Sequence, residues 1–442
     1  MEELHVKEAI DAYYKQNPVR LHMPGHKCSK RFLKAFDGAK KDLTEIDALD
    51  LSLPVKRAEE DVAKICNANF CRMLVNGATC GIFAMLYAVK DLGSKIIVNR
   101  TAHKSVFNAL TVLGIEPIIV NGENVNGGQI SVEETISALI KNPDAIGVFY
   151  TYPDYYGKTF DIENVYKAVK EAGKLLLIDN AHGAHLAFDE KVVYAGKFAD
   201  LWVDSAHKSL ATLNQGAVVF CAEERFAEKL DNAVNVFMTT SPSYPLLASI
   251  EYGFKFQSQK GKRLVREKIA PQIKRLMEYV ASQGLTCYSF SDKLKLILDC
   301  GKSGINAYSA EKILIDFKIY PEMNDGSKIL LMFSAMNKQR DFKRLKRAVK
   351  SICKNAERQT EVAKEFAVSK REIGYLKAKN SPFEMVELEK AIGRISACDF
   401  GIFPPCYPLV LAGEVISKES VGAVLTAVQT FGIKDGLVKV VK

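Results

Sequence analysis

The sequence lacks the long apolar runs and the cysteine pairs that are typical of membrane and secreted proteins. It contains no apolar run approaching the roughly 20 residues that a membrane helix needs. The opening Met1–His5 does not have the basic-then-apolar pattern of a signal peptide. The ten cysteines form no Cys-x-x-Cys pair and no zinc-ligand spacing. We therefore expect a cytoplasmic protein with reduced thiols, no membrane partner and no structural metal.

Motifs for nucleic-acid binding are also missing, although the formal charge is +9. The basic residues gather in helix-like stretches such as Lys338–Arg358. In this stretch Phe342, Leu345, Val349 and Ile352 recur at helical spacing, which predicts one buried stripe. The charges then belong to the solvated face of a helix, and we expect no nucleic-acid partner.

Short β-branched runs alternate with amphipathic runs between Asn76 and Cys221, which predicts an α/β fold with a mostly parallel sheet. The predicted strands are Lys95–Asn99, Pro117–Asn121, Ala145–Tyr150, Leu175–Asp179, Leu201–Asp204 and Ala217–Cys221. The predicted helices are Thr79–Leu92, Lys104–Leu113, Val132–Lys141 and Ile162–Ala172.

The pattern of charged and apolar residues changes after Gly253. A long basic helical stretch is followed by predicted strands Lys293–Asp299 and Ile329–Phe333, and then by helices to the C-terminus. We divide the chain into an N-terminal segment (1–45), a large domain (46–257) and a smaller C-terminal α/β domain (258–442), with the boundary near Gln257–Arg263.

Two charged side chains follow neighbouring predicted strands. Asp179 ends one buried strand, and Lys208 lies just beyond the next one. Ligands of open α/β sheets bind at the carboxyl ends of the strands. A pyridoxal cofactor needs this combination, a lysine as its Schiff-base partner and an acid that keeps its pyridine nitrogen protonated. Either residue alone is more often an ordinary cap, ion pair or surface charge.

Two further features support a cofactor site at this edge. The loop Asn76–Gly81 precedes a helix, so its backbone N–H groups and the Thr79 hydroxyl suit a phosphate, although the same residues also suit an ordinary N-cap. His103 follows another strand at the same edge, where an imidazole can stack on an aromatic ring or simply form loop hydrogen bonds.

Motifs spread over nearly the whole chain carry a family resemblance. They are Met23–His26, Asn76–Thr79, His103–Ser105, Tyr155–Gly157, Asp179–His185, Ser205–Lys208, Thr240–Tyr244 and Pro404–Pro408 through Glu414. In this order the sequence resembles the bacterial ornithine/lysine/arginine decarboxylases, which are fold type I (aspartate aminotransferase-like) enzymes that use pyridoxal 5′-phosphate (PLP). The chain is similar to the compact form of the family, without the wing domain.

The resemblance implies a role for individual residues. Lys208 forms the Schiff base, Asp179 pairs with the pyridinium nitrogen, His103 covers one ring face and Ala181 packs behind the other. His207 is a second candidate beside Lys208 for returning a proton to the substrate carbon. The implied cofactor contacts are Ala78, Thr79, Cys80, His103, Asp179, Ala181, His182, Ser205, His207 and Lys208, joined by Ser241 or Ser243 of a neighbouring subunit. A shared site of this kind implies a homodimer or a higher homo-oligomer.

Substrate choice depends on acidic residues. The resemblance implies arginine, lysine or ornithine as the substrate, and Glu322 and Asp325 are the candidate partners for its basic group, unless they belong to an exposed turn. The compact size favours arginine by analogy. Cys406 and Cys80 depart from the family pattern at two motifs and affect the expected pocket shape.

Three other functions stay open. Asp179, His182 and His185 have a spacing that suits a metal-dependent hydrolase, although this leaves Lys208 and the phosphate loop without a role. A PLP-dependent aminotransferase or another lyase needs the same cofactor residues. A non-catalytic relative is disfavoured because both the lysine and the acid are present.

Overall fold

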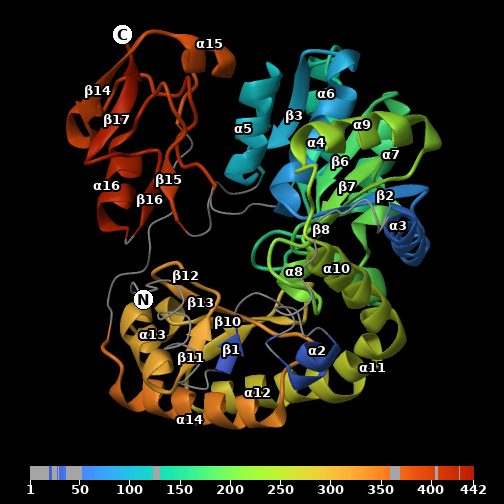
Figure 1. The fold of residues 1–442 in the computed structure, drawn as a ribbon. Coiled ribbons are helices and arrows are strands. Elements are labelled where there is room, and N and C mark those ends of the chain that lie inside the picture. The colour runs from blue at the N-terminus through green and yellow to red at the C-terminus, as the bar shows by residue number, and fades with distance from the viewer. Residues whose placement is uncertain are drawn as a thin grey trace, which may run out of the picture.

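The computed structural model describes residues 19–21, 27, 29–35, 52–122, 130–358, 369–403, 407–427 and 429–442. These residues form a large domain, a second domain and a C-terminal unit, which Figure 1 shows at the upper right, at the bottom and at the upper left. The motif Met23–His26 and residues Pro404–Cys406 lie outside the described residues, as does most of the expected N-terminal segment.

A seven-stranded sheet forms the centre of the large domain, with strand order β2-β8-β7-β6-β5-β3-β4. Strands β3 to β7 run parallel, and β8 runs antiparallel to both β7 and β2. The strands are β2 (Phe70–Leu74), β3 (Lys95–Asn99), β4 (Glu116–Val120), β5 (Gly147–Thr151), β6 (Leu175–Asp179), β7 (Leu201–Asp204) and β8 (Ala217–Cys221). The six predicted strands begin and end within two residues of these bounds, whereas β2 was not predicted.

Helices cover both faces of this sheet and enclose two hydrophobic cores. One face carries α4 (Gly77–Val89), α5 (Lys104–Leu113) and α9 (Ala227–Phe237). The other carries α3 (Ser52–Cys66), α6 (Val132–Lys141), α7 (Ile162–Glu171) and α10 (Tyr244–Phe256). Because both faces are covered, strands such as β6 are apolar along their length, which is why their bounds can be read from the sequence.

The second domain packs three helices on a four-stranded antiparallel sheet of order β12-β13-β10-β9. Its elements are α12 (Ala270–Ser282), β9 (Thr286–Tyr288), β10 (Lys295–Asp299), α13 (Ala307–Asp316), β11 (Ile319–Pro321), β12 (Met323–Asn324), β13 (Lys328–Met332) and α14 (Gln339–Asn355). Near the N-terminus lie β1 (Val19–Leu21), which pairs in parallel with β11, and α2 (Lys30–Ala35). Helix α14 buries Phe342, Leu345, Val349 and Ile352, so the predicted stripe is confirmed.

No loop separates the large domain from the second domain. Helix α10 continues through a π-helical turn (Gln257–Gly261), α11 (Lys262–Leu264) and a second π-helical turn (Val265–Ile269) into α12. The boundary expected near residues 257–263 therefore falls inside one long helical segment, visible along the lower right of Figure 1.

The prediction of helices up to the C-terminus is wrong for the C-terminal unit. It contains the strand pairs β14 (Phe383–Glu387) with β17 (Leu437–Val441) and β15 (Gly401–Ile402) with β16 (Thr430–Phe431), besides α15 (Tyr375–Asn380) and α16 (Lys418–Thr426). Its hydrophobic core is separate from that of the second domain, so the expected domain 258–442 contains two cores. Among the described helices, none combines the length and the apolar character that crossing a bilayer requires.

Candidate active site

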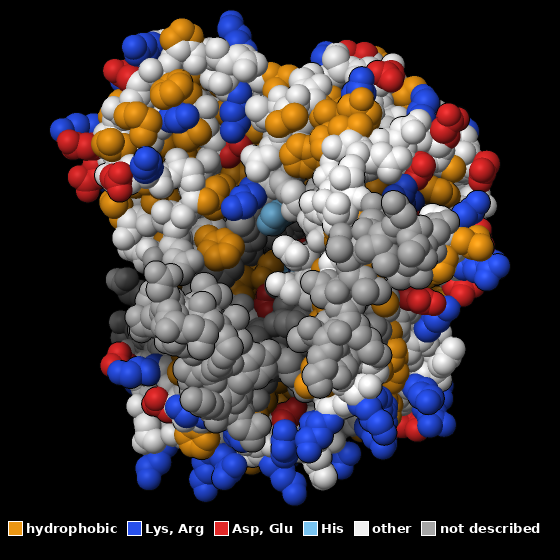
Figure 2. Space-filling model, viewed as in Figure 1, with side chains coloured by type: hydrophobic (Ala, Val, Ile, Leu, Met, Phe, Trp, Pro, Cys, Tyr) orange, Lys and Arg blue, Asp and Glu red, His pale blue; other side chains and the backbone are white. Residues whose placement is uncertain are grey.

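The carboxyl ends of four neighbouring strands meet at one cavity of about 380 Å³. Asn99 of β3, Thr151 of β5 and Asp179 of β6 line it, as does Ser205, which follows β7. The short helix α8 (Ala206–Ser209) then brings Lys208 to the same cavity. Parallel strands place their following residues at one edge, which explains why residues far apart in sequence converge here. The space-filling view shows a hollow between the three units, with a histidine at its edge (Figure 2).

Asp179 is a buried carboxylate that faces this cavity. Its side chain is 3% exposed, and its Oδ1 accepts a hydrogen bond of 3.0 Å from the backbone N–H of Ala181. Burial raises the pKa of Asp179, while the positive charge of Lys208 acts in the opposite direction. The carboxylate is therefore placed to attract a cationic group inside the cavity.

Lys208 lies against His182. The Lys208 Nζ atom is 3.0 Å from His182 Nε2, and the His182 ring packs 4.4 Å from the ring of Tyr155, measured between centroids. Burial and then the charge of Lys208 hold the pKa of His182 well below its usual value. His182 is thus a neutral ring that accepts a hydrogen bond from the lysine.

Two more histidines line the cavity in the neutral state. His103 caps the start of α5, where its Nδ1 accepts the backbone N–H of Ser105 at 3.2 Å. The Nδ1 atom of His207 lies 3.0 Å from the carbonyl oxygen of Gly216. Burial lowers the pKa of each ring to about 4. Both imidazoles are therefore uncharged near neutral pH and hold defined orientations.

The first turn of α4 supplies donors to the same cavity. Gly77, which adopts φ +74°, lines the cavity together with Ala78 and Thr79. The N-cap residue Asn76 makes no side-chain capping hydrogen bond with this helix. Uncapped N–H groups at a helix start favour a bound anion such as a phosphate.

The cavity fits a cofactor with a phosphate at one end and a basic ring nitrogen at the other. Within the described part of the chain, Thr151 Oγ1 and His182 Nδ1 are buried without a hydrogen-bond partner, and both residues line the cavity. Buried polar atoms of this kind are costly unless a ligand or water satisfies them. The residues present therefore suit PLP in the donors, the acid and the lysine that they offer.

The structure brings most of the predicted cofactor residues together. The cavity is lined by Ala78, Thr79, His103, Asp179, Ala181, His182, Ser205, His207 and Lys208. Cys80 is the exception within this set, because its side chain lies in the hydrophobic core and does not line the cavity. Ser241 is exposed, Ser243 occupies the N-cap position of α10 without a side-chain capping hydrogen bond, and neither lines the cavity of its own chain. Their contact across a subunit interface stays a prediction.

The two acidic residues predicted for the substrate lie one layer behind the cavity wall. Glu322 and Asp325 do not line the cavity. The hydroxyl of Tyr155 donates a hydrogen bond of 2.8 Å to Glu322 Oε1, and the hydroxyl of Tyr156 donates to Asp325 Oδ2. Both tyrosines line the cavity, so the two carboxylates act on it through them.

Two charged residues of this region were not predicted from the sequence. Asp154 is itself part of the cavity wall, next to Tyr155. Its signal was available, because it directly precedes the Tyr155–Gly157 motif after a predicted strand. Lys295 is fully buried in the second domain and reaches the same turn. Its contact spans about 140 positions of sequence, and no local pattern reveals it.

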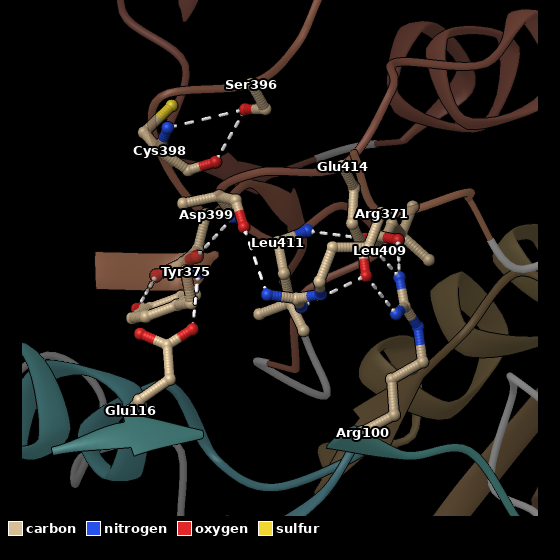
Figure 3. A network of polar contacts seen from close by, with 11 residues as sticks. Arg100, Glu116, Arg371, Tyr375, Ser396, Cys398, Asp399, Leu409, Leu411 and Glu414 are labelled. Carbon is tan, nitrogen blue, oxygen red and sulfur yellow. Dashed lines mark hydrogen bonds and ion pairs between the residues drawn. The ribbon is translucent and has the colours of Figure 1, made fainter. Parts of the chain in front are cut away.

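The C-terminal unit completes the cavity with Phe403 and Tyr407. A buried network of hydrogen bonds and ion pairs, shown in Figure 3, connects this unit to the sheet edge. Arg100, which directly follows β3, donates from its two Nη atoms to the two oxygens of Glu414 at 2.7 and 2.8 Å, and also to the carbonyl oxygen of Leu409 at 2.7 Å.

The rest of this network joins α15 to β4 and to the loops of the C-terminal unit. Tyr375 donates its hydroxyl to Asp399 at 2.7 Å, and its backbone N–H donates to Glu116 at 2.6 Å. Lys379 pairs with the same Asp399 oxygen at 2.6 Å. The network thus sets where Phe403 and Tyr407 stand relative to the strand ends.

The side chains of Asp179, His182 and His185 do not form a metal site. His182 faces Lys208, whereas the Nε2 atom of His185 lies 3.0 Å from Asp292 Oδ1 in the second domain. Across the described ranges, no three His, Cys, Asp or Glu side chains are grouped closely enough to hold a metal ion. The geometry gives no support to the metal-dependent hydrolase.

The chain has the fold type I (aspartate aminotransferase-like) α/β fold, as predicted. Solved structures with this fold include the constitutive lysine decarboxylase of Escherichia coli (TM-score 0.70, 19% identity, covering 89% of this chain and 75% of that one). Lysine decarboxylase A from Pseudomonas aeruginosa superposes with a TM-score of 0.76 at 15% identity, over 95% and 77% of the two chains.

Residues 6–294 match the major domain of the Orn/Lys/Arg decarboxylases. The chain belongs to this family, and the predicted enzyme class, an amino-acid decarboxylase, is confirmed. Among its relatives, the uncharacterized protein YaaO of Bacillus subtilis is 31% identical over 94% of this chain and 92% of its own length. An arginine decarboxylase of the same organism is 29% identical over 92% and 90% of the two chains.

Proposed function

We propose that this protein decarboxylates a basic amino acid with the help of PLP, which Lys208 binds as a Schiff base. The observation that carries the proposal is that Lys208 and Asp179 line one cavity together with the first turn of α4. In this proposal Asp179 contacts the pyridine nitrogen, His103 and Ala181 contact the ring faces, and Ala78, Thr79, Ser205 and His207 hold the phosphate.

The chemistry divides between the cofactor and the chain. Bound PLP supplies an electron sink that takes up the electron pair released when CO₂ leaves. The negative charge of Asp179 keeps the ring nitrogen protonated, and neutral His182 holds the Lys208 amine in place. His207 has a pKa of about 4 and points its Nδ1 at Gly216, so it carries no spare proton near neutral pH. This favours Lys208 as the residue that returns a proton to the substrate carbon.

A basic substrate suits the charge around the Tyr155–Tyr156 wall. Asp154 lines the cavity there, and Glu322 and Asp325 accept hydrogen bonds from the two tyrosines. After burial itself, the negative charges of Asp325 and Asp154 raise the pKa of Tyr407, so both carboxylates act on a residue of the cavity wall. Four relatives are named arginine decarboxylase, and we propose arginine as the preferred substrate.

We further propose that the enzyme works in the cytoplasm as a homodimer or larger homo-oligomer, in which Ser241 or Ser243 of one subunit approaches the phosphate of the next. Light scattering of the purified protein tests the assembly. A monomer that is fully active would contradict the shared site.

The direct test is CO₂ release from arginine, lysine and ornithine with added PLP. We expect turnover, fastest with arginine, and none with Lys208→Ala, while the exposed Lys197→Ala behaves as wild type. Undiminished turnover by Lys208→Ala would refute the assignment. Keto-acid product in place of CO₂ would support the alternative of a PLP-dependent aminotransferase.

A second variant tests the recognition of the basic group. Loss of a charged hydrogen-bond partner costs about 1.5–3 kcal/mol, so Asp154→Asn is expected to raise KM for arginine by about 10- to 100-fold. The exposed Asp189→Asn serves as the control. An unchanged KM in Asp154→Asn would remove Asp154 from the proposed substrate site.

A further inference from the structure

Lys295 is a lysine of the second domain that is buried against the active-site turn of the large domain. It begins β10, and its side chain is 1% exposed. Its Nζ donates to the backbone carbonyl oxygens of Tyr155 at 3.0 Å and Asp154 at 3.3 Å. Lysine is almost never fully buried unless its charge is paired, so this position needs an explanation.

The charges around Lys295 come from both domains. Burial lowers its pKa to about 8, while Asp292, Asp154 and Glu322 act to keep it charged. The charge of Lys208 acts on it in the same direction as burial, so the two lysines influence each other. Three carboxylates therefore favour the charged form of Lys295, whereas burial and the charge of Lys208 oppose it.

The turn that Lys295 holds is packed tightly against β10. Gly157 adopts φ +86°, and a Cβ atom there would lie 2.8 Å from Asp292 Cβ and 3.1 Å from Lys295 Cδ. The backbone N–H of Asp292 donates to the carbonyl oxygen of Gly157 at 3.0 Å. Asp292 Oδ1 also lies 3.0 Å from His185 Nε2, so the same segment touches the chain that follows Asp179.

A short series of contacts connects this turn to Lys208. Lys295 fixes the backbone of Tyr155, the Tyr155 ring packs on His182, and His182 Nε2 lies 3.0 Å from Lys208 Nζ. We propose that Lys295 is a positioning residue, which uses the second domain to hold Tyr155 against His182 and thereby fixes His182 beside Lys208. This inference rests on the proposed function, because it assigns Lys295 a part in preparing Lys208 for the cofactor.

The test compares Lys295→Met with Lys295→Arg and with Lys293→Met. Methionine has a similar length but neither charge nor donors, whereas arginine retains both. Lys293 is the matched control, because it lies two residues away, is exposed and donates to Ser289 and Phe290 within its own segment.

Three measurements distinguish positioning from a purely structural contribution. Misplacement of a catalytic group by about 1 Å can cost about 100-fold in rate, so we expect Lys295→Met to lower kcat by about 100-fold with little change in KM. In the cofactor-free protein, the amides of residues 154–157 should exchange with deuterium faster. In the PLP-bound protein, the pH midpoint of the visible absorbance should rise, because a positive charge near Lys208 is lost.

The other titratable groups that face Lys208 stay in place in this comparison. They are Asp179 of β6, His182 after β6, His103 at the start of α5 and His207 of α8. Lys295→Arg should therefore restore most of the wild-type absorbance midpoint, even if its bulk slows the reaction, and Lys293→Met should match wild type in all three measurements.

The double variant Lys295→Met/Tyr155→Ala tests the series of contacts. If Lys295 acts through Tyr155, the double variant should lose little more activity than the more affected single variant. Additive losses, or a Lys295→Met protein that equals wild type in exchange, absorbance and kcat, would overturn the inference. A wild-type protein that releases no CO₂ from any basic amino acid would instead refute the proposed function, and the exchange measurement still decides whether Lys295 holds the turn.

Discussion

Two sets of charged side chains are buried at the same edge of the large-domain sheet. Arg100 follows β3 and is matched by Glu414, so that both carboxylate oxygens and both Nη atoms have partners within the chain. Asp179 ends β6 and faces a cavity that it shares with Lys208. The first set joins two parts of the molecule, whereas the second faces the cavity. Burial alone therefore does not identify the active site; the location of each partner does.

Asp204 shows that two neighbouring residues can face in different directions, one toward the protein interior and the other toward the cavity. It ends β7, directly before the cavity residue Ser205, yet it does not line the cavity. It accepts hydrogen bonds from the amide of Asn180 and from the hydroxyl of Tyr194, the latter at 2.7 Å. A strand that ends in aspartate thus occurs twice at this edge, once toward a ligand and once toward the protein interior.

Among the variants that distinguish the two sets, Asp179→Asn is expected to have the largest effect, which is on kcat. The amide has the same shape but no charge, so it cannot hold a protonated ring nitrogen. Removing one such electrostatic contribution typically costs about 100- to 1000-fold in kcat. The midpoint of thermal unfolding of the cofactor-free protein should change little, because the cost of burying the Asp179 charge opposes the attraction of Lys208. Activity close to that of the control Asp189→Asn would place Asp179 in the structural set.

Arg100→Met should mainly reduce the stability of the protein, whereas Asp179→Asn mainly reduces kcat. It leaves Glu414 buried without its main partner, and breaking a buried ion pair from one side typically costs about 3–5 kcal/mol. We expect a loss of that size in the free energy of unfolding, measured with urea. The double variant Arg100→Met/Glu414→Gln should recover part of it, since neither fully buried charge remains and Arg371, which also pairs with Glu414 at 3.4 Å, is partly exposed. Strictly additive losses would contradict the assignment of this pair.

The pH dependence of the stability of Asp204→Asn tests whether Asp204, like Arg100 and Glu414, interacts only with partners inside the protein. Burial raises the pKa of Asp204 from 3.8 to about 7 in the folded protein. Between about pH 4 and 7 the folded state keeps a proton that the unfolded state releases, so this group makes wild type less stable as the pH rises, by up to about 1.4 kcal/mol per pH unit. Asparagine does not titrate.

The stability of Asp204→Asn relative to wild type should therefore increase between about pH 4 and 7 and level off above that range. The fixed cost of placing an amide between Asn180 and Tyr194 shifts this difference by a constant and does not alter its slope. A difference that is flat with pH would mean that Asp204 is ionised in the folded protein.

Tyr375→Phe should have the smallest effect. It removes the hydroxyl that donates to Asp399, but Lys379 still pairs with that carboxylate. Loss of one hydrogen bond of this kind costs about 1 kcal/mol. Urea unfolding should detect this decrease, with kcat unchanged. A large loss of activity would mean that the C-terminal unit controls the cavity more directly than its contacts indicate.

The sequence predicts the central sheet well because its strands are buried on both faces. An unbroken apolar run such as Leu175–Ile178 followed by an acid has few interpretations, and the strand ends then place Asp179, Ser205 and Lys208 at one edge. The family resemblance supplied the roles of His103 and Ala181, which periodicity alone does not give.

The C-terminal half was harder to predict. Strand β14 is mostly exposed and mixes charged with apolar residues, so it has no clear period. Long-range pairs such as Arg100 with Glu414 join residues 314 positions apart. Lys295 reads as an ordinary strand residue until the tertiary structure places it against Tyr155. Contacts of this type depend on how the units pack together, which local patterns do not encode.

We propose that the amine of Lys208 holds the cofactor at a cavity in which Asp179 supplies the matching charge. Borohydride reduction of the PLP-treated protein, followed by digestion and mass spectrometry, tests it directly. We expect one pyridoxyl-phosphate adduct, on the peptide that contains Lys208, and its loss in Lys208→Ala. An adduct chiefly on another lysine, such as Lys295, or no adduct despite active turnover, would contradict it.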